Sequence, residues 1–187
     1  VGDVLGAQET KPLLSLRARR GFTLIELLIA FALIGILIVI AVPAFQHWIQ
    51  NTQIRNGAEG ILNGLQLARA EAVRRNTNVQ LVMTTGSGWT IATAAAPTVI
   101  LQSRVAGEGS SSATVAILPG GADRISFNGL GTIVANADAS ASITSLDVAS
   151  ATLSGTAIRP LKVVISTGGS PKMCDPAVAS SDPRACP

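Results

Sequence analysis

Glu26 is the only charged residue in a long apolar run, FTLIELLIAFALIGILIVIAVPAF, that extends from Phe22 to Phe45. At about 1.5 Å per residue the run would form a helix of about 36 Å, enough to cross a hydrocarbon core of about 30 Å. A carboxylate inside such a segment costs several kcal/mol unless a cation pairs with it. Glu26 therefore either reaches the nearby membrane surface or pairs with a cation supplied by another subunit, and the local sequence leaves both open.

The charges around this run predict its orientation. Arg17, Arg19 and Arg20 directly precede it, and no comparable cluster follows closely. The positive-inside bias then keeps the N-terminus in the cytoplasm and places residues 46–187 across the membrane. A cleaved secretory signal is disfavoured because its apolar region would span only about 7–15 residues. A buried core helix is seldom so uniformly apolar. We therefore expect a single-pass anchor.

Composition excludes several other classes of protein. Hydrophobic residues make up 48% and charged residues 13%, which rules out intrinsic disorder and fits a cytosolic enzyme poorly. Aromatic residues are 3% and tyrosine is absent, which argues against a stacking platform for single-stranded nucleic acid. Residues 1–21 carry four basic and two acidic side chains, and the remainder carries ten and nine. The body of the protein is thus nearly neutral.

Motifs that carry catalysis are missing from the sequence. There is no Walker A motif, Cys-x-x-Cys pair, His-Glu-x-x-His or nucleophile elbow. The single histidine, His47, lies next to the expected membrane segment, where it is a poor base for a serine nucleophile. We expect no enzymatic activity, no metal site and no cofactor.

The helix is expected to continue beyond the membrane to about Arg75 as an amphipathic segment. Apolar residues recur there at steps of four and three, a single stripe that requires a partner such as a sheet: Ile54, Ala58, Ile61, Leu65, Ala68 and Ala72. Arg55 and Glu59, and Glu71 and Arg75, have the spacing of helical ion pairs. Pro43 lacks a backbone donor and predicts a kink. The glycines at 57, 60 and 64 either permit close packing or are neutral.

Beyond Asn76 the pattern changes to short β-rich runs separated by Gly, Ser and Pro. The expected strands are 78–84, 89–94, 98–105, 113–118, 124–128, 131–135, 143–149 and 161–166. Residues 135–158 are rich in Ala, Ser and Thr and read as weak strands or a long mobile loop.

Cys174 and Cys186 are the only cysteines and lie on the translocated side. An oxidising compartment favours a disulfide between them, which stabilises the fold by about 3 kcal/mol in chain-entropy terms. Two unpaired thiols are the alternative, and a zinc site would need more ligands.

The segment Arg20-Gly21-Phe22-Thr23-Leu24-Ile25-Glu26-Leu27-Leu28 resembles the class III signal of type IV prepilins and type II secretion pseudopilins. The resemblance implies that a prepilin peptidase cuts between Gly21 and Phe22 and methylates the Phe22 amine. In a filament, Glu26 would pair with the ammonium of a neighbouring Phe22, and removing one partner of a buried pair costs about 3–5 kcal/mol. Gly35 and Pro43 lie where this superfamily places helix-softening residues.

Two further segments narrow the resemblance to the GspH/FimT group: the helix exit LARAEAVRRN (67–76) followed by VQLV (79–82), and the turn FNGLG (127–131). An α+β, type IV pilin-like fold is implied, with a long N-terminal helix packed on an antiparallel sheet. We expect residues 1–21 as a leader, 22–45 as the transmembrane half, 46–76 as the amphipathic half and 77–187 as a periplasmic β-rich domain. The implied role is a minor pilin or pseudopilin that primes or caps a filament with other pilins, in the inner membrane or, within a pilus, outside the cell.

DNA binding during natural transformation is the alternative that the resemblance raises. Some FimT-type pilins carry a Gly-Arg-x-Arg motif just before the first C-terminal cysteine. The matching stretch here, Gly169-Ser170-Pro171-Lys172, keeps one of the two basic positions. The candidate DNA contacts are Lys172, Arg184, Arg159 and Lys162.

Overall fold

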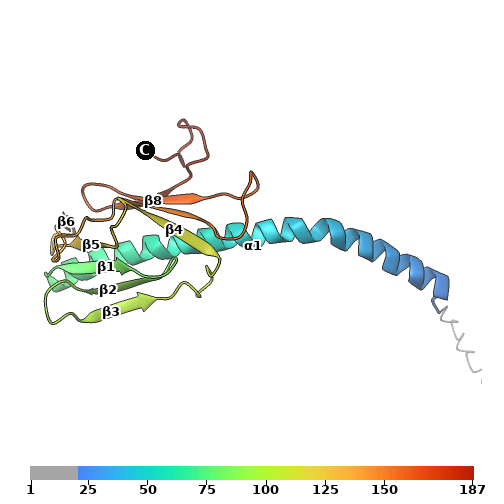
Figure 1. Ribbon diagram of the computed structural model, residues 1–187, viewed down its shortest axis with the longest axis horizontal. Helices are drawn as coiled ribbons and strands as arrows, with labels where there is room; N and C mark the ends of the chain where they lie inside the picture. The colour runs from blue at the N-terminus through green and yellow to red at the C-terminus, as the bar shows by residue number, and fades with distance from the viewer. Residues whose placement is uncertain (1–20) are drawn as a thin grey trace, which may run out of the picture. The chain divides into compact units, whose positions relative to one another are not determined.

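The computed structural model describes residues 21–187, so the predicted leader, with Arg17, Arg19 and Arg20, lies outside the described residues apart from Gly21. A single uninterrupted helix, α1, extends from Leu24 to Arg75 (Figure 1). The chain divides between Ala41 and Val42 into two compact units. The first part of α1 is long and apolar enough to cross a membrane, and none of that stretch is buried. Because Pro43 lies inside the helix without interrupting it, the predicted kink stays a prediction.

Both ends of α1 follow from local chemistry. Thr23 caps the start, because its Oγ1 accepts a hydrogen bond from the backbone N–H of Glu26 at 3.2 Å. At the other end Asn76 adopts a left-handed φ of 48°, and the N–H of Thr77 donates to the carbonyl of Ala72. Hydrogen bonds from Arg74, and then from Arg75, lower the pKa of Glu71 to about 2.

Nine strands form two antiparallel sheets rather than the single sheet expected. The strands are β1 (Val79–Met83), β2 (Trp89–Thr93), β3 (Ile100–Arg104), β4 (Ala113–Leu118), β5 (Arg124–Phe127), β6 (Ile133–Val134), β7 (Ser145–Ser150), β8 (Leu161–Ile165) and β9 (Pro171–Cys174). Their order is β3-β2-β1-β5-β6 in one sheet and β4-β7-β8-β9 in the other. The α+β class with a helix on antiparallel sheet is confirmed (Figure 1).

Eight of the strands match the expected runs, although several are shorter, and β9 was not expected. Strand β9 starts at Pro171, directly after Gly168-Gly169-Ser170. A run of glycine, serine and proline is typical of a turn, so no strand was predicted there. The edge position explains why proline is tolerated there, since only one side of β9 pairs with a neighbour. Residues 135–158, which were expected to form weak strands or a long loop, contain β7 at their centre. This strand pairs with β4 on one side and β8 on the other.

The apolar stripe of α1 forms the centre of the core. All six of its predicted residues have no exposed surface. They belong to one cluster with buried side chains from both sheets: Val79, Leu81, Ile91, Ile125, Phe127, Leu146, Val148 and Val163. The periodicity in the sequence therefore identified the buried face of the helix correctly.

Glycines in the buried half of α1 permit the helix to approach the sheet that contains β2 closely. The indole Nε1 of Trp89 donates to the carbonyl of Gly60 at 2.9 Å. A Cβ added at Gly64 would lie 2.6 Å from the same indole ring. Of the two interpretations of these glycines, close packing is the one that the structure supports.

Replacing Gly64 with Ala tests this packing. Alanine gains up to about 1 kcal/mol in helix propensity, but overpacking costs about 1–3 kcal/mol, so we expect a net loss of stability. Thermal unfolding of the detergent-purified protein, followed by circular dichroism, measures it. Gly35→Ala is the matched control, because Gly35 also lies inside α1 and no heavy atom lies within 4 Å of its added Cβ. A Gly64→Ala protein at least as stable as the wild type would contradict close packing.

Candidate functional site

The first residues of the described chain are open to solvent and unpaired. Phe22 is 82% exposed, and nothing approaches Gly21 within 4 Å of an added Cβ. Among residues 21–187, no ion pair involves the carboxylate of Glu26. Within residues 21–187 the carboxylate of Glu26 accepts no hydrogen bond from another side chain, and its backbone N–H donates to Oγ1 of Thr23. The junction between Gly21 and Phe22 is thus sterically accessible, and Glu26 has no cation from its own described chain.

The surface of α1 around Glu26 is almost entirely apolar. Large exposed hydrophobic side chains continue from Phe22 to Phe45, including Leu27, Phe31, Ile38 and Val42. A monomeric soluble protein rarely exposes such a continuous patch, so the segment requires lipid or neighbouring helices around it.

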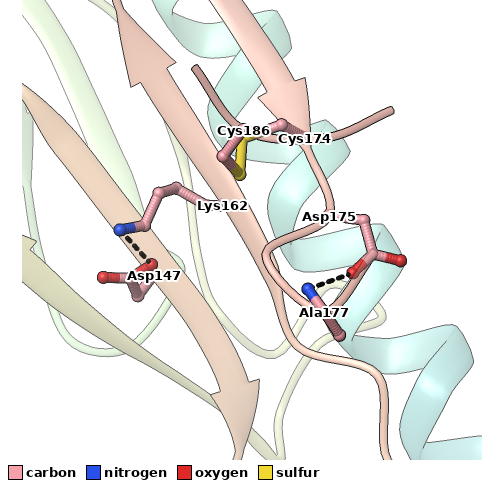
Figure 2. The surroundings of a disulfide bond; sticks show 6 residues. All are labelled: Asp147, Lys162, Cys174, Asp175, Ala177 and Cys186. Carbon is pink, nitrogen blue, oxygen red and sulfur yellow. Dashed lines mark hydrogen bonds and ion pairs between the residues drawn. A yellow bond between two sulfur atoms is a disulfide. The ribbon is translucent and has the colours of Figure 1, made fainter. Parts of the chain in front are cut away.

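The C-terminal segment is closed by the predicted disulfide. Cys174, at the end of β9, is bonded to Cys186 (Figure 2). Directly after Cys174, the N–H of Asp175 donates to the carbonyl of Arg184 at 2.8 Å. Arg184 in turn forms an ion pair with Asp182 at 2.8 Å and lowers the pKa of that carboxyl to about 2. The disulfide and this backbone hydrogen bond therefore close the loop against the end of β9, while the ion pair lies within the loop itself.

The four basic residues predicted as DNA contacts do not form one surface. Lys162 on β8 forms an ion pair with Asp147 on β7 at 3.1 Å (Figure 2). Lys172 is exposed on β9 opposite Val164, so it lies diagonally across from Lys162 on the same sheet face. Arg159 and Arg184 instead line a cavity that neither lysine reaches.

That cavity has a volume of about 380 Å³ and was not foreseen from the sequence. It lies between α1, β8, β9 and the disulfide loop, and its lining comprises Trp48, Asn51, Thr52, Arg55, Arg159, Leu161, Met173, Cys174, Asp175 and Arg184. We call it the helix–loop pocket. A second cavity, of about 530 Å³, places Arg69 and Arg74 of α1 beside Ser170 and Pro171. The sequence around these residues gives no sign of either cavity, because each is formed where the β8–β9 part of the chain packs against α1, far away in sequence.

Two family models match the chain. The model for "Type II transport protein GspH" matches residues 57–169, which cover the buried part of α1 and all strands through β8. The chain belongs to the GspH family. The "Prokaryotic N-terminal methylation motif" matches residues 16–42, which include Gly21, Phe22 and Glu26. The disulfide loop lies beyond the part that defines the GspH family.

Curated relatives of this GspH-family chain are fimbrial proteins, matched over short segments. The type IV major fimbrial protein FimA of Dichelobacter nodosus is 43% identical over 53 residues, 28% of this chain and 32% of that protein. A fimbrial protein of Pseudomonas aeruginosa is 40% identical over 58 residues, 31% and 37% of the two chains. The chain therefore spans about a third of the length of these relatives.

A solved structure is also similar to this chain. The crystal structure of the type IV minor pilin FimU of Pseudomonas aeruginosa covers 71% of this chain and 94% of that chain, with 23% sequence identity and a TM-score of 0.46.

The disulfide makes a stability prediction for this GspH-family domain. We expect the double substitution Cys174→Ala and Cys186→Ala to lower the free energy of unfolding by about 3 kcal/mol, because the unfolded chain regains the freedom of an open loop. Urea unfolding followed by circular dichroism measures the change. Reduced wild-type protein should match the variant, and equal stability of the variant and the oxidised wild type would refute the contribution.

Proposed function

We propose that this chain is a minor pilin or pseudopilin, a structural subunit that primes or caps assembly of a type IV pilus or a type II secretion pseudopilus. The observation that carries the proposal is the contrast between the two halves of α1. The first half of the helix is exposed and, apart from Glu26, apolar. The apolar stripe of the second half is buried against two sheets. Membership of the GspH family and the methylation-motif match support the same role.

Processing would convert the precursor into a subunit that can assemble. A prepilin peptidase cuts between Gly21 and Phe22 and methylates the new amine of Phe22. The precursor sits in the inner membrane with its leader in the cytoplasm and residues 77–187 in the periplasm. The exposure of Phe22 supports access by the enzyme.

Glu26 would then set the register between subunits. In the assembled filament its carboxylate pairs with the terminal ammonium of a neighbouring Phe22. Both groups are desolvated there, so one axial offset between helices is favoured over others. The lack of any ion pair for Glu26 within residues 21–187 supports a partner from outside the subunit.

Substitution of Glu26 tests this pairing against a simple capping role. We expect Glu26→Ala and Glu26→Gln proteins to be inserted and processed but to be lost from filaments, because both lack the charge. Thr23→Ala removes the helix cap and keeps the carboxylate, so it should still be incorporated. Immunoblots of membrane and sheared-filament fractions give the readout. Wild-type incorporation of Glu26→Gln would rule out the charge pair.

DNA binding is the second candidate function, and Lys172 is the observation that favours it. Its side chain is exposed, and within residues 21–187 it has no ion pair. The other three candidates are less available, since Lys162 and Arg184 are paired with carboxylates and Arg159 lies in the helix–loop pocket. We therefore place this function behind assembly.

A mobility-shift assay separates the two candidates. With detergent-purified full-length protein at low salt, we expect no shift of duplex DNA if the role is purely structural. Retardation that weakens in Lys172→Gln and with added salt would establish the DNA-binding function instead, because each phosphate contact contributes to the salt dependence.

A further inference from the structure

The helix–loop pocket lies at the end of the domain that adjoins the membrane segment. Its helical lining begins at Trp48 and ends at Arg55, three and ten residues beyond Phe45. At about 1.5 Å per residue, this places the pocket about 4–15 Å above the last residue of the apolar run. Headgroups occupy roughly 5–7 Å beyond the hydrocarbon on each side. If the chain is anchored as proposed, the lower edge of the pocket lies among lipid headgroups.

Local contacts of Trp48 and Asn51 hold the lower edge of the pocket in place. Trp48 is 63% exposed and stacks on Phe45 with ring centroids 5.6 Å apart, as expected of an aromatic residue at a membrane interface. Asn51 holds the neighbouring loop, because its Nδ2 donates to the carbonyl of Ala157 and its Oδ1 accepts from the N–H of Arg159, both at 2.9 Å. The backbone of Arg159 is thereby held beside Asn51.

Among the charged residues that line the pocket, one cation, Arg159, and one anion, Asp175, form no ion pair within the described part of the chain. Asp182 chiefly, and Asp175 to a smaller extent, raise the pKa of Arg184, so the charge of Asp175 also acts on that guanidinium. Arg55 pairs with Glu59 at 2.8 Å, and Arg184 pairs with Asp182 at 2.8 Å. Arg159 and Asp175 form no ion pair within residues 21–187, either with each other or with another side chain.

Asp175 is mostly buried, with 9% of its surface exposed. One carboxylate oxygen accepts a hydrogen bond from the N–H of Ala177 at 2.9 Å, as Figure 2 shows. The second carboxylate oxygen accepts no hydrogen bond within residues 21–187. Two opposite charges that share a pocket without pairing are complementary to a ligand that itself carries both signs.

We propose that the helix–loop pocket binds the headgroup of a phosphoethanolamine lipid. The guanidinium of Arg159 donates to the phosphate oxygens, and the carboxylate of Asp175 accepts from the primary ammonium. The acyl chains then run along α1 past Trp48 and Phe45. A choline headgroup carries its positive charge without an N–H donor, and a glycerol headgroup carries no cation. The pocket should therefore prefer the ethanolamine lipid over both.

Native mass spectrometry of the full-length protein in mild detergent tests this preference. The protein is incubated with equal amounts of the ethanolamine, choline and glycerol phospholipids, and the retained lipids are counted. We expect about tenfold enrichment of the ethanolamine lipid over the choline lipid, the effect of one charge-assisted hydrogen bond.

Two conservative variants locate the binding. Arg159→Gln keeps the backbone N–H that binds Asn51, and Asp175→Asn keeps an oxygen for Ala177. Asp175→Asn should abolish the enrichment, because it removes the charge that selects the ammonium. Arg159→Gln should lower the retention of all three lipids alike, because each of them carries the phosphate. Lys172→Gln, an exposed cation outside the pocket, should retain the enrichment.

The outcomes separate this inference from the proposed function. Equal retention of the three lipids by the wild type, enrichment that survives Asp175→Asn, or undiminished retention of all three lipids by Arg159→Gln would overturn the pocket as a headgroup site. Flotation of the protein with vesicles made only of choline lipid tests the membrane anchor independently. Failure to float would contradict the anchoring while leaving the detergent measurement of lipid preference valid.

Discussion

Burial of one apolar stripe of α1 against two sheets is the interaction on which the rest of the domain depends. Ile54, Ile61 and Leu65 lose all exposed surface, and the same cluster contains buried side chains from both sheets. Hydrophobic burial of this kind is the dominant favourable contribution to folding. Because the helix is continuous, the same element must suit a protein core in one half and an apolar environment in the other. The change occurs within the few residues after Phe45.

That constraint accounts for features that look unrelated in sequence. Two glycines of the helix, Gly60 and Gly64, let it approach Trp89 closely. The disulfide and the hydrogen bond from the N–H of Asp175 to the carbonyl of Arg184 hold the last segment beside the edge strand β9. Polar and charged side chains gather around the helix–loop pocket, where the domain adjoins the apolar segment. The two residues proposed to act in assembly lie at the other end: Phe22 just precedes α1, and Glu26 is in its first turn.

Local patterns in the sequence predicted the helix, its buried stripe, eight strands and the Cys174–Cys186 disulfide, and the structure confirmed these. Periodicity and turn residues encode such features within a few positions. The division into two sheets, strand β9 and the separation of Arg159 from Lys172 were missed. The division into sheets depends on which distant strands pair. β9 pairs with its neighbour in sequence, β8, but it begins with a proline that suggested a turn. The methylation, cleavage and filament roles remain predictions.

The central claim is that this chain becomes a filament subunit whose mature first residue is Phe22. Mass spectrometry of sheared surface filaments from cells that express the protein tests it directly. We predict an N-terminal peptide that begins at N-methylated Phe22 and co-purifies with the major pilin or pseudopilin. Recovery of the protein only in the membrane, or in filaments with residues 1–21 still attached, would contradict the claim.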